Sequence, residues 1–231
     1  MQWLAKTAFW LLTDLEIEGQ ENFPSKGPLL MVGNHFSMVD IPAFVRAAPY
    51  PVEFIGGAVT INAPPILRII PRMWGYLPVY RGTGAQFALK EAEKVLKNNG
   101  VVAVFPEGGS HARMLRPPRP GPAFLAARTK ARILPVGLIN MDEVFECLGK
   151  FKRAKVKIRL GKPFGPFNTS EGGRNREELN KIGNIIMQRI ADLLPAEKHG
   201  YLSTDPVLRA EVMDFPWEQS EEGSVEATNV R

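Results

Sequence analysis

The chain has 231 residues, of which 45% are hydrophobic, 23% charged and 9% aromatic, a composition that predicts a packed core and excludes wholesale disorder. Its single cysteine, Cys147, excludes a disulfide framework within the chain and a cysteine-rich zinc module, and is typical of a reducing compartment. The net charge of +5 is unevenly spread, because residues 61–160 carry 18 basic and 6 acidic side chains. Such a basic block attracts phosphates, whether on nucleic acid, on an anionic membrane or on a small substrate.

The N-terminal residues 1–12 are largely apolar, with Trp3 and Trp10 among them and Lys6 as their only charged side chain. The apolar run is too short for a secretory signal, and no run in the chain approaches the roughly 20 residues that span a bilayer. Two interpretations stay open for this segment. It is either a helix that lies on a membrane surface or a segment that packs its tryptophans on the domain. We assign residues 1–16 to a membrane-associating segment.

The rest of the chain alternates short apolar runs with amphipathic stretches. Strands are predicted at residues 29–32, 52–55, 77–80, 101–105, 133–139 and 156–160, and helices at 84–98, 122–129 and 175–194. Most of these strands are apolar throughout, which predicts a sheet covered on both faces. We expect a single α/β domain over residues 17–200, with a mostly parallel or mixed central sheet covered by helices. Residues 201–231 are expected to form an acidic, mobile tail.

The first candidate site follows the first predicted strand, in the run Asn34-His35-Phe36-Ser37-Met38-Val39-Asp40. Residues five apart on one helix point in different directions, so His35 and Asp40 can meet only if a turn precedes the helix. Pro42 favours a helix start near Asp40, because proline is tolerated in a first helical turn. A carboxylate on one imidazole nitrogen makes the other nitrogen a base. A helix cap at Asp40, a capping box from Ser37 and a plain turn remain alternatives.

Two further segments also lie at strand ends. Phe105-Pro106-Glu107-Gly108-Gly109-Ser110 places glycines where the backbone can approach a ligand and its N–H groups can bind an anion, although such a run is also a common turn. Arg81 closes the strand at 77–80, where its guanidinium could hold a phosphate, although an isolated arginine is more often a surface charge.

Together and in this order, these segments resemble the motifs of the glycerolipid acyltransferase family typified by bacterial 1-acylglycerol-3-phosphate acyltransferase, over roughly residues 17–200. The family's first motif, Asn-His-x-Ser-x-x-Asp, matches Asn34, His35, Ser37 and Asp40. Its second, arginine-ending block resembles residues 75–81, its Phe-Pro-Glu-Gly block matches residues 105–108, and its Val/Ile-Pro-Val strand resembles residues 133–137. The resemblance implies catalysis by His35 and Asp40. It implies substrate binding by Asn34, Ser37, Arg81, Glu107, Gly108, Gly109 and Ser110.

One departure concerns the third motif, which in the family continues Thr-Arg-Ser but here reads Gly109-Ser110-His111. The arginine associated with the acceptor phosphate is therefore missing from its usual place. Arg113, Arg116 or Arg119 is a candidate replacement, unless this stretch is simply a solvated loop. Glu107 beside a phosphate would be repulsive, so we expect it to orient an acceptor hydroxyl or to hold an arginine.

The resemblance further implies that an acyl thioester, either acyl-CoA or acyl-carrier protein, donates to 1-acylglycerol 3-phosphate at the cytoplasmic face of a membrane. The expected partners are the membrane surface, its anionic lipids and the donor. We expect no cofactor, because the donor is a substrate. We expect no metal, because His111 and His199 lack a ligand pattern, and no nucleic acid, because the basic residues 155–159 alternate as on a solvated strand face. A different acceptor and a non-catalytic, membrane-binding relative are the alternatives.

Overall fold

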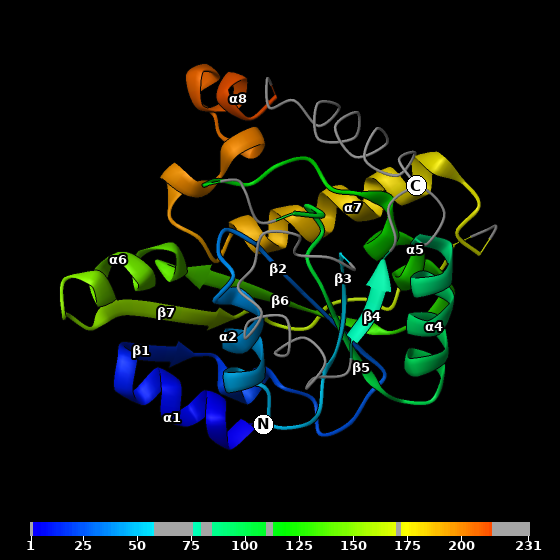
Figure 1. Cartoon of the computed structure of the whole chain (residues 1–231). Coiled ribbons are helices and arrows are strands. Elements are labelled where there is room, and N and C mark those ends of the chain that lie inside the picture. Colours follow the sequence, from blue (N-terminus) through cyan, green and yellow to red (C-terminus); the bar gives the residue numbers. More distant parts are fainter. Residues whose placement is uncertain (1, 58–75, 80–84, 110–112, 170–171, 214–231) are drawn as a thin grey trace, which may run out of the picture.

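The computed structural model describes residues 2–57, 76–79, 85–109, 113–169 and 172–213 (Figure 1). The strands are β1 (Thr13–Glu18), β2 (Leu29–Gly33), β3 (Glu53–Gly57), β4 (Tyr76–Val79), β5 (Val101–Val104), β6 (Arg132–Ile139) and β7 (Ala154–Leu160). The α-helices are α1 (Gln2–Leu12), α2 (Asp40–Ala47), α4 (Ala85–Lys97), α5 (Pro120–Thr129), α6 (Val144–Gly149), α7 (Arg176–Ala191) and α8 (Pro206–Met213). Short 3-10 turns are η1 (Gln20–Asn22), η2 (Met141–Glu143), η3 (Ala196–Lys198) and η4 (Gly200–Leu202).

The strands form one seven-stranded sheet in the order β1-β7-β6-β2-β5-β3-β4. The five strands from β6 to β4 run parallel to one another. β7 pairs antiparallel with β6 and parallel with β1, so these two strands run in the opposite direction. The predicted α/β class and mixed sheet are confirmed. The carboxyl ends of β2, β5 and β6 meet at one edge of the sheet, where open α/β sheets usually bind ligands.

Helices cover both faces of the central strands, and alternate strand residues enter two separate cores. Leu29 and Met31 of β2 pack with α1 and α2, whereas Leu30 and Val32 pack with α4, α5 and α7 (Figure 1). This explains why the central strands read as continuous apolar runs, since neither face is exposed to water. The predicted helices at 84–98, 122–129 and 175–194 correspond to α4, α5 and α7. Asn175 caps α7, because its side chain accepts hydrogen bonds from two backbone N–H groups.

The pair β1 and β7 differs from the central strands because one of its faces is polar. Lys157 lies 2.9 Å from carboxylate oxygens of both Glu16 and Glu18, and Arg159 lies 2.9 Å from Glu18. The alternating basic residues are therefore one charged face of a strand, as the sequence predicts, and β1 supplies their counter-charges. Strand β1 was not predicted. It contains residues on both sides of the expected boundary at residue 17, so the sheet begins before that position.

The C-terminal part keeps regular structure beyond the expected boundary at residue 200. Turn η4 and helix α8 continue the fold to Met213, although no element was predicted there. The remainder of the predicted acidic tail, residues 214–231, lies outside the described residues.

Candidate active site

The fold brings the first and third predicted motifs together at the carboxyl edge of the sheet. β2 ends at Gly33 and leads into the loop that carries His35, and its neighbour β5 ends at Val104 and leads into the loop that carries Glu107. β6, which contains the fourth predicted motif, pairs with β2 on its other side. The motifs therefore share one edge because their strands are parallel neighbours.

A histidine and an aspartate form the centre of this edge. His35 Nδ1 lies 3.0 Å from Asp40 Oδ2, and the same oxygen accepts hydrogen bonds from the backbone N–H groups of Phe36, at 2.7 Å, and Ser37, at 2.8 Å. Helix α2 begins at Asp40, so the predicted turn before the helix is confirmed. A carboxylate on Nδ1 favours the tautomer with its proton there, which leaves the lone pair on Nε2. The pair is thus arranged as a base and its orienting carboxylate.

The geometry decides between this arrangement and a simple helix cap. The cap position of α2 is Val39, and its side chain makes no capping hydrogen bond. Asp40 instead holds N–H groups that precede the helix, and the Ser37 hydroxyl accepts from Val39 N at 3.3 Å. Burial raises the pKa of Asp40, while the hydrogen bond from His35 and those from the two backbone N–H groups oppose the rise. The carboxyl is therefore committed to shaping the turn and holding the imidazole.

Two phenylalanines fix the plane of the imidazole. The His35 ring stacks on Phe105 with a centroid distance of 4.0 Å and an interplanar angle of 15°. Phe105 in turn meets the edge of Phe44 of α2 at 5.2 Å. Phe105 belongs to the predicted Phe-Pro-Glu-Gly motif, but the sequence alone does not indicate a role for its ring. Its place directly before Pro106-Glu107 was the available signal.

Asn34, expected to bind substrate, has a side chain that is used within the protein. Its side chain is fully buried, its amide nitrogen donates to Leu138 O at 2.9 Å, and its amide oxygen accepts from Leu138 N at 2.8 Å. Both ends of the amide are thereby used by the backbone of β6. We therefore correct the assignment of Asn34 from substrate binding to positioning of the His35 loop.

Glu107 is also buried and also joins two loops. Its Oε1 accepts from His35 N at 3.0 Å, and its Oε2 accepts from Arg116 N at 3.1 Å. Burial raises the pKa of Glu107 to about 8, although both backbone hydrogen bonds oppose the rise. The expected contact with an acceptor hydroxyl is replaced by a bridge between the loop after β2 and the loop before α5. As expected, Glu107 interacts with an arginine: it accepts a hydrogen bond from the backbone N–H of Arg116, and the charge of that guanidinium also opposes the rise of the Glu107 pKa.

The candidate arginines of the loop before α5 have different environments. Arg116 is 2% exposed and its Nη2 donates to Gly109 O at 3.1 Å, so its guanidinium braces the loop. Arg119 is exposed, its N–H donates to Pro106 O at 2.8 Å, and its side chain runs along Gly108. A Cβ on Gly108, which has a φ of 74°, would lie 3.1 Å from Arg119 Cγ. Glycine therefore fits here both for its left-handed backbone and for this close approach.

Arg113 is exposed. Arg81 and Ser110, both predicted to bind substrate, lie outside the described residues.

Among the described residues, there is no group of three or more His, Cys, Asp or Glu side chains that could hold a metal ion.

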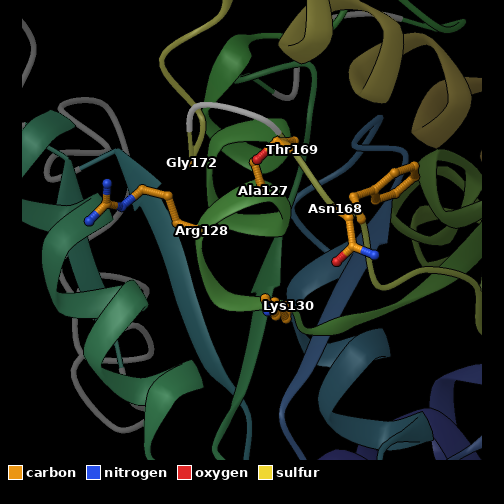
Figure 2. A pocket seen from close by; sticks show the side chains of 7 residues that line it. Ala127, Arg128, Lys130, Asn168, Thr169 and Gly172 are labelled. Atoms are coloured by element: carbon orange, nitrogen blue, oxygen red, sulfur yellow. The ribbon is translucent and has the colours of Figure 1, made fainter.

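A cavity of about 340 Å³ lies between the end of α5 and the loop before α7 (Figure 2), and its lining residues are Ala127, Arg128, Lys130, Phe167, Asn168, Thr169 and Gly172. Residues 127–130 lead into the amino end of β6, at the edge of the sheet opposite His35. The cavity is therefore separate from the site described above.

Helix α1 presents an apolar face to solvent. Ala5 and Phe9 are buried in the core, whereas Trp3 and Trp10 are 72% and 73% exposed. Of the two interpretations left open for this segment, the one in which the tryptophans pack on the domain does not describe this structure. Leu4 and Leu11 lie on the same exposed side of the helix as the two tryptophans. The opposite side of the helix packs against the core. None of the helices in the described ranges is both long enough and apolar enough to cross a bilayer.

Comparisons with known proteins find acyltransferases. A family model described as Acyltransferase matches residues 14–139. A Borreliella burgdorferi protein called 1-acyl-sn-glycerol-3-phosphate acyltransferase is 27% identical over 147 residues, which is 61% of this chain and 57% of that relative. The chain thus matches little more than half the length of this relative. A Bacillus subtilis protein of the same name is 22% identical over 180 residues, which is 78% of this chain and 87% of the relative.

The fold has a counterpart among solved structures. The crystal structure of the 1-acyl-sn-glycerophosphate (LPA) acyltransferase PlsC from Thermotoga maritima is similar with a TM-score of 0.61 and 26% sequence identity. The similarity covers 83% of this chain and 77% of that one.

Proposed function

The chain belongs to the Acyltransferase family, and from this premise we propose that it moves a fatty acyl group from a thioester to a hydroxyl of a lysophospholipid. The acceptor we propose is 1-acylglycerol 3-phosphate, which would give phosphatidic acid, and the donor is acyl-CoA or acyl-carrier protein. Both curated relatives carry the name of that activity. The observation that carries the proposal is the contact of 3.0 Å between His35 Nδ1 and the buried carboxylate of Asp40.

The proposed mechanism is direct transfer without an acyl-enzyme. His35 Nε2 takes the proton of the acceptor hydroxyl while its oxygen attacks the thioester carbonyl carbon. The tetrahedral intermediate then breaks its carbon–sulfur bond, and the departing thiolate receives the proton from the imidazolium. Asp40 keeps Nδ1 oriented and stabilises the imidazolium between these steps, as in triads that use the same pair.

The phosphate of the acceptor is bound by basic groups around the catalytic edge of the sheet. Arg119 replaces the arginine that is absent from the third motif, since its side chain lies along Gly108, next to the carboxyl that bonds to His35 N. The backbone N–H of Gly109 stabilises developing negative charge, whereas that of Gly108 donates to Phe105 O at 3.1 Å and holds the turn. Arg81 is proposed as a second phosphate ligand on the strength of the motif resemblance.

The exposed face of α1 supports a peripheral position on a membrane. Tryptophan and leucine side chains on one side of a helix partition into the headgroup region, and Lys6 favours anionic lipids. We propose that Trp3, Leu4, Trp10 and Leu11 rest on the cytoplasmic face of a membrane, which brings the site close to its lipid acceptor.

A different acceptor is the second candidate, and the third motif favours it. Gly109 stands where the family usually has threonine, and the following arginine is replaced by Ser110. Glycerol 3-phosphate, another lysophospholipid or a glycolipid is then the substrate for the same chemistry. The intact His35 and Asp40 pair argues against a non-catalytic relative.

The test is acyl transfer by the purified chain. Acyl-CoA and acyl-carrier protein donors are offered with 1-acylglycerol 3-phosphate, glycerol 3-phosphate or lysophosphatidylcholine, and acylated products are identified by mass. His35→Ala is expected to remove product formation while circular dichroism and the Tm stay close to wild type. Product formation by His35→Ala would refute the mechanism. Absence of product from the wild-type chain with every donor and acceptor would refute the proposed activity.

A further inference from the structure

The segment after α7 lies outside residues 14–139, the part that the family model matches, yet it packs against the catalytic edge. Leu115 N donates to Lys198 O at 2.9 Å, and Tyr201 N donates to Leu115 O at 3.0 Å. Figure 1 shows this segment, in orange, meeting the green loop that leads to α5. A Cβ on Gly200, which has a φ of 51°, would lie 2.0 Å from Leu115 O, so this position requires glycine. The segment is therefore fixed at this edge.

The attachment places the ammonium of Lys198 above the catalytic turn. Lys198 Nζ lies 5.6 Å from the centroid of the Phe36 ring, and Phe36 follows His35 directly and donates its N–H to Asp40. Lys198 Nζ also lies 3.5 Å from a carboxylate oxygen of Asp142 in η2. The lysine side chain is 23% exposed, so the ammonium is held in place but open to a ligand.

We infer that Lys198 is a specificity-determining residue that binds the phosphate of the acyl acceptor. An ammonium has three donors, and a contact with an aromatic face and a long ion pair leave it able to bind an incoming phosphate oxygen. Asp142 then acts as the counter-ion that the phosphate displaces. The inference rests on the proposed function, because it concerns the acceptor of that reaction.

Steady-state kinetics of four variants test the inference in the full-length chain. With 1-acylglycerol 3-phosphate as acceptor, Lys198→Gln is expected to raise the acceptor KM about tenfold, the effect of losing one charge-assisted hydrogen bond. The kcat and the donor KM stay within about twofold of wild type, since the lysine touches neither reacting group. Lys198→Arg restores most of the affinity. Lys181→Gln, at an exposed lysine of α7 that pairs with Glu177, serves as the matched control and leaves the acceptor KM unchanged.

The fourth variant, Asp142→Asn, separates ligand binding from a structural ion pair. Removing the competing carboxylate lowers the acceptor KM if Lys198 binds phosphate. A raised acceptor KM in both Asp142→Asn and Lys198→Gln, with a lower Tm for both, would show a structural pair and overturn the inference. If Lys198→Gln raises only the donor KM, the lysine binds the donor's phosphates and the inference is overturned. An unchanged acceptor KM in Lys198→Gln would likewise show that the lysine does not bind the acceptor.

Equilibrium binding of 1-acylglycerol 3-phosphate to the wild-type and Lys198→Gln chains keeps the two hypotheses apart. If the wild-type chain shows no transfer activity but binds this lipid more tightly than the Lys198→Gln chain does, the proposed activity is refuted and the role of Lys198 in phosphate binding is supported. Equal binding by both chains overturns the role of Lys198, whatever the activity.

Discussion

Replacing Glu107 by glutamine tests the buried carboxyl that joins the two catalytic loops. Both of its oxygens accept backbone hydrogen bonds, from His35 N at 3.0 Å and from Arg116 N at 3.1 Å. Glutamine has one oxygen, so its amide nitrogen faces one of these N–H groups and leaves it unpaired. A buried donor without a partner costs about 1–3 kcal/mol, and we expect Glu107→Gln to lower the free energy of unfolding by that amount at pH 5.

The pH dependence of this difference is the sharper part of the prediction. Burial raises the pKa of Glu107 from 4.5 to about 8. Between those values the folded chain keeps a proton that the unfolded chain has released, so the contribution of Glu107 to stability falls as the pH rises. The fall is at most about 1.4 kcal/mol per pH unit and ends above pH 8, where both states are ionised. Glutamine does not titrate, so the advantage of wild type over Glu107→Gln shrinks as the pH rises from 5 and is expected to be lost before pH 8.

Urea unfolding followed by circular dichroism at pH 5, 7 and 9 measures both effects. Glu177→Gln, at an exposed carboxylate of α7 that pairs with Lys181, is the matched control. Parallel pH dependences of wild type and Glu107→Gln would refute the reasoning, because they would show that Glu107 ionises alike in the folded and unfolded chains.

Three further outcomes are expected. Asp40→Asn lowers kcat by about two to four orders of magnitude in the transfer assay, since the imidazole loses its orienting carboxylate, and an effect confined to the donor KM would contradict this role. Asn34→Ala lowers the free energy of urea unfolding by about 1–3 kcal/mol for each of the two backbone groups of Leu138 that it leaves unpaired, and wild-type stability would show that water replaces the amide. Replacing Trp3 and Trp10 by serine weakens sedimentation with anionic vesicles and leaves the Tm unchanged, whereas undiminished vesicle binding with a lower Tm would assign the tryptophans to packing.

The geometry of the catalytic pair was predictable from local sequence, because it depends on the five-residue spacing of His35 and Asp40 and on the nearby Pro42. Pro42 places the helix start near Asp40, and the turn then brings His35 within reach. The roles of Asn34 and Glu107 were not predictable in this way. Their partners are backbone groups of distant residues, 104 positions away for Asn34 and 72 for the bond from Glu107 to His35. Backbone partners leave no trace in the side-chain pattern.

In the fold, too, features set by the local sequence were predictable, whereas features that depend on distant residues were not. The central strands were predicted because burial on both faces makes them continuously apolar. Strand β1 alternates Leu15 and Ile17 with acidic residues, and the strand that it pairs with, β7, lies far along the chain. The position of Lys198 likewise depends on its backbone contact with Leu115, which its own sequence neighbourhood does not encode.

The hydrogen bonds that hold the catalytic turn end on backbone atoms, so they do not depend on which side chain the partner residue carries. Asn34 binds the N–H and carbonyl of Leu138, and Glu107 binds the N–H groups of His35 and Arg116. Every residue except proline offers the same backbone groups, so these hydrogen bonds do not themselves specify the side chain at position 138 or 116. The imidazole therefore keeps its position through backbone contacts, while the side chains of Arg116 and Leu138 serve the loop and the core.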